Sequence, residues 1–242
     1  MSNLRQTVDE GVLVRFWSID HHRAERVPWP ISPWPKLVYA AQGTLQVESN
    51  DRLWILPTNQ ALWIDAGESH RSETLGKAQV RTLYFSPKMM VRRANGPLEI
   101  CPLLKELIVE TCAAGPLVEG DVVLASLAMV LQFEVERAAA IPSGIIMPRS
   151  PWLRQWALKF LAYPLEWPTC DYSRRTLERQ MSKETGLTLG QWRRQARAVI
   201  GLRSLAMGST VFEAAIEAGF ASSSGFIHSF SKKFGVTPGR IK

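Results

Sequence analysis

The chain has few cysteines and no long hydrophobic run. Its 242 residues hold only three cysteines, Cys101, Cys112 and Cys170, and no C-x-x-C pair, so neither a disulfide framework nor a cysteine metal site is expected. The longest apolar stretch, residues 122–133, is far shorter than the roughly 20 residues that cross a bilayer. The first ten residues contain no apolar signal core. We therefore expect a cytoplasmic protein without membrane contact.

Positive charge is unevenly distributed along the chain, whose formal total is +7. Residues 151–242 contain 14 Lys and Arg against 6 Asp and Glu, which gives +8, whereas residues 1–150 contain 15 against 16, which gives −1. Such a concentration of positive charge is typical of a module that binds a polyanion. The overall composition, 46% apolar and 21% charged, is that of a folded globular protein.

The N-terminal part has the pattern of short β-strands separated by turns. Thr44–Glu48 alternates between apolar and polar residues, Ser49–Asp51 has turn chemistry, and Arg52–Leu56 returns as a strand. Similar segments occur at 12–19, 37–41, 61–64 and 78–85. Several strands in succession, without helical segments between them, predict an antiparallel sandwich or small barrel.

Two helices are expected after these strands. Leu104, Leu107 and Ile108 mark one face of a segment that begins at Pro102, and a second segment from Glu119 carries apolar residues at helical spacing. The two helices could cover the open face of the barrel. They could also present an apolar ridge to a partner subunit, and one helix could serve both purposes.

The segments from Trp152 onward have helical periodicity. Ser173 is suited to cap a helix that ends at Gly186. Further along, a short helix, Gly219 and a serine-rich helix start give the layout of a helix-turn-helix. Phe226 and Phe230, with a third phenylalanine four residues later, are predicted to face the core.

The C-terminal residues resemble a known signature. They are similar to the signature of the AraC/XylS family of bacterial transcription regulators. The matching residues are Gly219–Phe220, the three phenylalanines, Gly235 and Thr237–Gly239. The segments 37–43, 54–57, 61–70 and 81–84 resemble the cupin-type sensor domain of one subgroup of that family. The resemblance implies a barrel that binds a small-molecule effector, helices that dimerise, and two helix-turn-helix units that read successive major-groove segments.

The expected fold class is α+β: an N-terminal antiparallel, cupin-like β-barrel with two helices, followed by an all-α helix-turn-helix domain whose first unit is shortened. We expect an effector-sensing domain over residues 1–95, a helical dimerisation segment over 96–145, a linker over 146–151 and a DNA-binding domain over 152–242.

The first helix-turn-helix unit departs from the family pattern. A whole support helix is expected between Thr169 and Ser173, where only Cys170, Asp171 and Tyr172 stand. Three residues cannot form that helix. We expect the following helix to find cover on the Trp152 helix, and the first unit to bind DNA weakly or without sequence preference while the second unit reads bases.

The resemblance places the candidate DNA contacts on both units. Small polar residues would read bases and cations would hold phosphates. The predicted residues are Ser173, Arg174, Arg175, Glu178 and Arg179 on the first unit, and Ser223, Ser224, His228, Lys232 and Lys233 on the second.

Aromatic residues are frequent in the N-terminal part and could stack on a flat effector or simply fill the core. The predicted effector pocket consists of Trp34, Tyr39, Trp54, Trp63 and His70. One histidine does not make a metal site, which needs about three protein ligands. We therefore predict no metal and no cofactor.

The leading interpretation is a sequence-specific transcription regulator, an activator or repressor, that responds to a small molecule and binds promoter or operator DNA as a homodimer. RNA polymerase would be a further partner, and no catalytic residues are predicted. One alternative is a cupin-type enzyme with a basic helical tail. The other is a regulator with impaired autonomous DNA binding that acts through a partner, because the support helix is missing.

Overall fold

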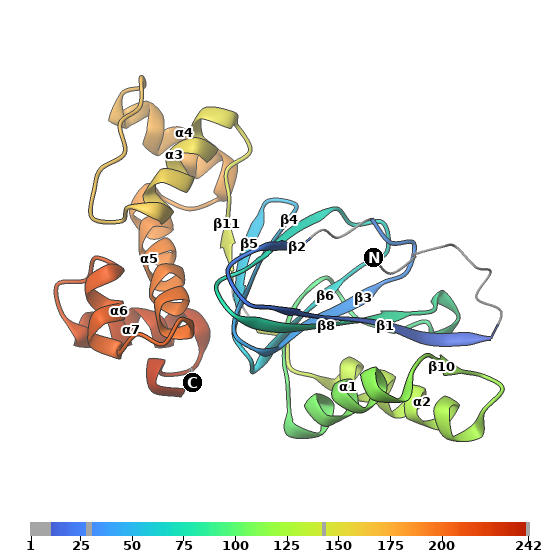
Figure 1. The fold of residues 1–242 in the computed structure, drawn as a ribbon. Coiled ribbons are helices and arrows are strands. Elements are labelled where there is room, and N and C mark those ends of the chain that lie inside the picture. Colours follow the sequence, from blue (N-terminus) through green and yellow to red (C-terminus); the bar gives the residue numbers. More distant parts are fainter. Residues whose placement is uncertain (1–10, 28–30, 142–143, 241–242) are drawn as a thin grey trace.

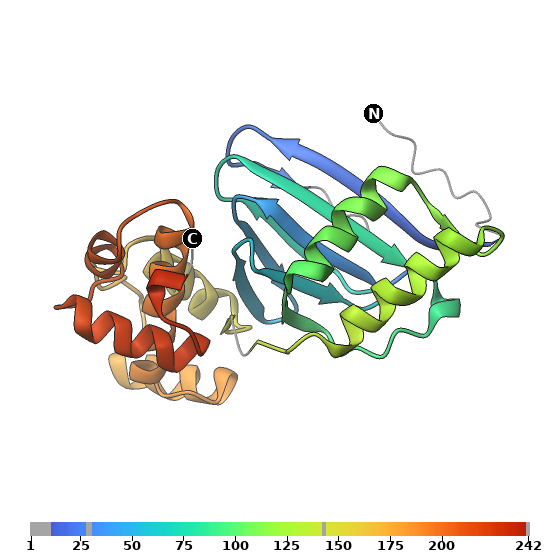
Figure 2. The ribbon, with the colours of Figure 1, turned by 90° about the horizontal axis from the view of Figure 1, so that it is seen from below.

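The structure is a computed structural model that describes residues 11–27, 31–141 and 144–240. A two-sheet β-barrel carries a pair of helices against one sheet and a five-helix domain beside the other (Figures 1 and 2). This arrangement confirms the expected α+β class, with antiparallel strands first and a helical domain last. In the described part of the chain, no helix combines the length and apolarity that a bilayer crossing needs.

The barrel consists of two antiparallel sheets. The six-stranded sheet has the order β10-β1-β8-β3-β6-β9, and the five-stranded sheet has the order β11-β5-β4-β7-β2. The strands of the first are β1 (Val12–His21), β3 (Lys36–Gln42), β6 (Gln60–Ile64), β8 (Ala78–Phe85), β9 (Gly96–Glu99) and β10 (Leu117–Val118). Those of the second are β2 (Arg26–Val27), β4 (Leu45–Ser49), β5 (Arg52–Leu56), β7 (His70–Thr74) and β11 (Ile145–Ile146).

Alternation along the strands sorts their side chains between separate cores. In β3, Val38 and Ala40 pack in a core inside the barrel together with Trp54 of β5. Leu37 and Tyr39 point to the other side of the same sheet. Successive strand residues face opposite sides, so a sheet that is covered on both faces is apolar throughout.

The helices α1 (Pro102–Ala114) and α2 (Val122–Arg137) cover the outer face of the six-stranded sheet (Figure 2). Asp121 caps α2 by accepting hydrogen bonds from the backbone N–H groups of Val123 and Leu124. Leu131 and Val135 of α2 are fully buried against the sheet. The helix pair therefore covers the barrel, as one of the two interpretations of its apolar faces predicts.

The C-terminal domain consists of five helices, whose core also includes Leu53, Ile55 and Leu75 of the barrel. The helices are α3 (Pro151–Ala162), α4 (Arg174–Thr185), α5 (Leu189–Ala206), α6 (Val211–Glu217) and α7 (Ser223–Phe234). Short 3-10 turns occur at η1 (Pro87–Met89) and η2 (Pro238–Arg240). The long helix α5 runs through the domain and contacts the other helices (Figure 1), so it joins the two predicted helix-turn-helix units.

The stretch predicted to be a linker lies against the barrel. Ile145 pairs with Leu53 in the five-stranded sheet, which places β11 at the edge of that sheet. Arg149 forms an ion pair with Asp51 at the β4–β5 turn, and Arg154 of α3 forms another with Glu48. The six-stranded sheet extends to Glu99, past the boundary expected at residue 95. The domain boundaries at 95, 145 and 151 stay predictions.

Gly201 lies where α5 and α7 come into contact. A Cβ atom at this position would lie 2.3 Å from Cε2 of Phe226, which is fully buried. We expect Gly201→Ala to lower the free energy of unfolding by about 1–3 kcal/mol, the usual cost of overpacking a core. Chemical denaturation of the full-length protein measures this change.

Gly190 supplies a matched control on the same helix. It is exposed, and an added Cβ would meet nothing within 4 Å. Gly190→Ala should raise stability by about 0.5–1 kcal/mol, since alanine loses less backbone entropy in a helix. Equal effects of the two substitutions would contradict the tight contact between α5 and α7.

Candidate nucleic-acid interface

The second helix-turn-helix unit has defined ends for both of its helices. The Thr210 hydroxyl accepts from the Glu213 N–H, and the Glu213 carboxylate accepts from the Thr210 N–H, which forms a reciprocal cap at the start of α6. Gly219 adopts φ = 75° in the turn. Ser222 then caps α7 by accepting from the Gly225 N–H. These local interactions fix the angle at which α7 leaves the turn.

One face of α7 is buried through a ladder of aromatic rings. Phe226, Phe230 and Phe234 are buried, with ring centroids 5.4 Å and 4.6 Å apart along the helix. Phe220, in the turn, adds a ring centroid 5.4 Å from that of Phe226. Since these side chains anchor α7 on the domain core, the opposite face of the helix must point outward.

The outward face of α7 carries Ser224, Ile227, His228 and Lys232, all exposed. Three of the five residues that sequence patterns place on this unit are among them, whereas Ser223 and Lys233 are half-buried. A rigid helix with an exposed, mostly polar face that ends in a cation is suited to enter a DNA major groove.

The first unit has no helix between Ala162, where α3 ends, and Arg174, where α4 begins. The structure describes every residue of this stretch. Trp167 packs against Trp156 of α3 instead, with ring centroids 5.6 Å apart, and the Trp156 indole N–H donates to the Pro168 carbonyl over 3.0 Å. Leu177 of α4 is buried in the same core as Trp156. The α4 helix thus finds its cover on α3, as the sequence predicts.

The outer face of α4 is exposed to solvent. Arg174, Arg175, Glu178 and Arg179 are exposed, and Ser173 caps the helix by accepting from the Thr176 N–H. The Arg174 guanidinium donates to the Glu178 carboxylate over 3.0 Å and lies 5.6 Å from the Trp167 ring. All five candidate contacts predicted for this unit therefore lie together at one surface, although their role in DNA binding stays a prediction.

Glu184 of α4 links the first unit to the start of α3. It accepts from the backbone N–H groups of Arg149 over 2.6 Å and Ser150 over 2.9 Å, and from Gln180 over 2.6 Å. Ser150 precedes α3 and makes no side-chain cap of its own. Burial acts to raise the pKa of Glu184, but the hydrogen bonds from Ser150, Gln180 and Arg149 outweigh it and lower the pKa to about 2.

The residues predicted to line an effector pocket do not lie together. Trp54 packs inside the barrel, and His70 is on the inward-facing register of β7. Tyr39 and Trp63 lie on the opposite face, in the core under α1 and α2. The Tyr39 hydroxyl donates to the Thr58 carbonyl over 2.9 Å, and the Trp63 indole to Asp65 over 2.9 Å. These two aromatic residues are core residues with satisfied polar groups.

Trp34 lies outside both barrel cores, next to a cation. The Arg15 guanidinium carbon is 4.3 Å from the centroid of its ring, within the range of a cation–π contact. Its backbone N–H donates to the Ser32 hydroxyl over 3.1 Å. Trp34 is half-buried, and neither barrel core includes it.

The barrel interior contains a buried lysine that sequence reasoning missed. Lys36 is 1% exposed and precedes Val38 on the inward register of β3. Burial lowers the pKa of Lys36 to about 8. Burial, together with the Lys36 charge, also lowers the pKa of His70 to about 4. The two-residue alternation with Val38 and Ala40 is the sequence signal that could have placed Lys36 inside.

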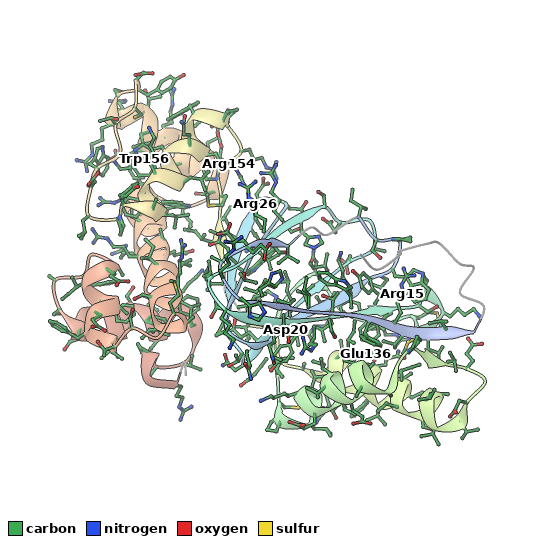
Figure 3. All side chains as sticks on the ribbon, in the orientation of Figure 1. Arg15, Asp20, Arg26, Glu136, Arg154 and Trp156 are labelled. Carbon is green, nitrogen blue, oxygen red and sulfur yellow. The ribbon has the colours of Figure 1, made fainter. Side chains whose placement is uncertain are left out.

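Metal-ligating side chains do not gather in the described ranges 11–27, 31–141 and 144–240, where no three His, Cys, Asp or Glu residues are close enough to hold an ion. Figure 3 shows the side chains distributed over both domains. The His21 side chain contacts a carboxylate: its Nδ1 lies 3.1 Å from Oε2 of Glu25.

The capped helices α6 and α7 have the arrangement of a helix-turn-helix. Residues 170–242 match a family described as a helix-turn-helix domain. Over 213 residues the chain is 28% identical to the HTH-type transcriptional regulator NimR of Escherichia coli (strain K12), covering 85% of this chain and 78% of NimR. The chain is thus similar to a helix-turn-helix transcriptional regulator, in agreement with the AraC-type resemblance of its C-terminal signature.

Two solved structures extend over nearly the whole chain at low similarity. ToxT from Vibrio cholerae O395 is 11% identical with a TM-score of 0.37, covering 96% of this chain and 97% of ToxT. The AraC-like transcriptional activator CuxR is 10% identical with a TM-score of 0.38, covering 95% of this chain and 78% of CuxR.

The capping role of Glu184 predicts a pH-dependent effect of its substitution. Glu184→Gln should lower the free energy of unfolding by about 1 kcal/mol at pH 7, because charge-assisted hydrogen bonds to two N–H groups are weakened. The folded-state pKa is below the ordinary 4.5. The contribution is therefore fully present above pH 4.5 and is lost as the pH falls towards 2.

Denaturation of both proteins at pH 7 and pH 3 measures this difference, which should shrink at the lower pH. Glu178→Gln is the control, since Glu178 is exposed on the same helix and pairs with Arg174 at the surface, where such pairs contribute little. A difference that stays constant between pH 7 and pH 3 would contradict the cap.

Proposed function

We propose that this chain is a transcriptional regulator that reads DNA through α7, holds the DNA backbone through α4, and is controlled by a small molecule in its barrel. The observation that carries the proposal is the α7 helix, which is anchored by buried phenylalanines and presents Ser224, His228 and Lys232 to solvent. Ser224 and His228 carry groups that can hydrogen-bond to base edges, and Lys232 carries a cation that can bind phosphate.

The two units would contribute differently. The outer face of α4 is rich in cations. Arg174 and Glu178 on this face form a hydrogen bond with each other, which partly occupies groups that could otherwise contact bases. The support of α4 comes from a loop that contains Trp167 in place of a helix. We therefore assign mainly phosphate contacts to α4 and base contacts to α7.

The effector would bind inside the barrel. Trp54 and His70 remain as candidates from the predicted pocket, and Lys36 is added by its position on the same inward-facing side. The polar and aromatic character of these side chains fits a small polar molecule.

A homodimer is supported by an unusual apolar surface on α2. Val122, Met129 and Phe133 are 81%, 70% and 61% exposed, although they lie on a helix whose other face is buried. A contiguous exposed apolar stripe of this kind commonly marks a subunit interface. Dimerisation would bring two copies of α7 to repeated half-sites. RNA polymerase is the further partner that an activator would contact.

DNA binding by the full-length protein tests the function. Selection from randomised DNA should yield a consensus sequence, and Lys232→Ala should weaken binding to all sequences and reduce the slope of log K against log salt by about 0.9, the effect of removing one bound phosphate. His228→Ala should instead relax the preference at one base position, by about 1–3 kcal/mol. Lys88→Ala is the control for loss of a charge, because Lys88 pairs with Glu119 on the barrel.

Footprinting on the selected site distinguishes the two units. We expect one strongly protected major-groove segment per protomer. Two equally protected segments would contradict the division of roles between α4 and α7. Weak association without a consensus would instead favour a regulator that needs a partner protein, and no association at all would contradict DNA binding.

The dimer has its own test. Phe133→Glu places a charge in the apolar stripe and should convert a dimer into a monomer, as measured by sedimentation equilibrium. Phe212→Glu is the matched control, because Phe212 is 64% exposed on α6 of the helical domain. A dimer that survives Phe133→Glu, or dissociates equally with Phe212→Glu, would contradict the α2 interface.

A further inference from the structure

A groove of about 630 Å³ lies between α5 and α7. Gln191, Arg194 and Gln195 line it from α5, and His228, Lys232 and Lys233 line it from α7. Sequence patterns place the three α7 residues at the DNA but assign nothing to the two glutamines. The groove contains no aspartate or glutamate among its lining residues.

Lys233 is held in this groove without an acidic partner. Its ammonium group donates to Oε1 of Gln195 over 3.0 Å, and no ion pair forms between Lys233 and a carboxylate in the described part of the chain. Burial lowers the pKa of Lys233 to about 8, and the nearby Arg52 of β5 acts in the same direction. A half-buried cation beside another cation gains favourable electrostatic energy when an anion binds next to it.

The groove is continuous with the face of α7 that would read bases. His228 and Lys232 line the groove and also a shallow surface beside Ser224 and Ile227. A DNA strand whose bases meet Ser224 would therefore pass its backbone along the cations of the groove. Phosphate is the anion that guanidinium, ammonium and amide N–H groups bind together.

We infer that the groove between α5 and α7 binds a backbone phosphate of DNA, with Arg194 and Lys233 supplying charge and Gln195 positioning Lys233. This inference rests on the proposed function and adds a contact made by α5, the helix that joins the two units. The phosphate would supply an anionic partner for Lys233, which pairs with no carboxylate among the described residues.

Gln195→Glu tests the site with minimal change of shape. The new carboxylate lies at the position of the Gln195 amide, so it should pair with Lys233, leave the fold intact and repel the phosphate. On a site selected by the wild-type protein, DNA affinity should fall, and the slope of log K against log salt should flatten by about 0.9 for each phosphate that is no longer bound. Thermal denaturation should show an unchanged or higher melting temperature.

Gln155→Glu is the matched control, because Gln155 is exposed on α3 outside the groove and the substitution changes the net charge equally. Equal affinities and slopes for the Gln195→Glu and Gln155→Glu variants would overturn the inference, while selective binding by the wild-type protein would still uphold the proposed function. Absence of any DNA binding by the wild type would instead remove the proposed function itself.

Inorganic phosphate tests whether the groove binds a phosphate group. At matched ionic strength, replacing chloride with millimolar phosphate should weaken DNA binding by the wild type more than DNA binding by Gln195→Glu, because free phosphate would compete with the DNA backbone for the same groove. Equal effects of phosphate on the two proteins would overturn the inference.

Discussion

The structure depends on one constraint: the outer face of the five-stranded sheet is apolar and must be covered. Leu53, Ile55 and Leu75 of the barrel share a core with Trp192 and Phe230 of the helical domain. Burying such side chains contributes about 1.5–3 kcal/mol each, which is large compared with the surface ion pairs at the same junction. The position of α5 relative to the barrel is therefore set mainly by hydrophobic packing.

The absence of a support helix is compensated by aromatic packing. Trp167 lies between Trp156 of α3 and the guanidinium of Arg193, whose carbon is 4.8 Å from the ring centroid. An indole ring buries a large apolar area for one residue and accepts cations on its faces. It does not reproduce the rigid framework of a second helix. The orientation of α4 therefore depends on α3 and on the hydrogen bonds of Glu184.

Much of the fold could be predicted from sequence because its signals are local. The caps at Ser173 and Thr210 and the phenylalanine spacing in α7 confirm the expected helices. The effector residues were harder to place, because the six-stranded sheet is apolar on both faces and alternation does not reveal which face is the interior. The sequence therefore groups Trp63 with Trp54, although α1 and α2 cover Trp63. The two-residue strand β11 carries too short a pattern to predict.

The core of the helical domain also includes residues that precede its first helix in the sequence. The Trp192 indole donates to the Ile146 carbonyl over 2.7 Å, and Ile145 and Met147 are buried in the core of the helical domain. A fragment that begins at Pro151 would lack all three residues. Its Trp192 donor would lose its partner, at a cost of about 1–3 kcal/mol, and its apolar surface would meet water. We therefore expect such a fragment to be less stable than the same helices in the full chain.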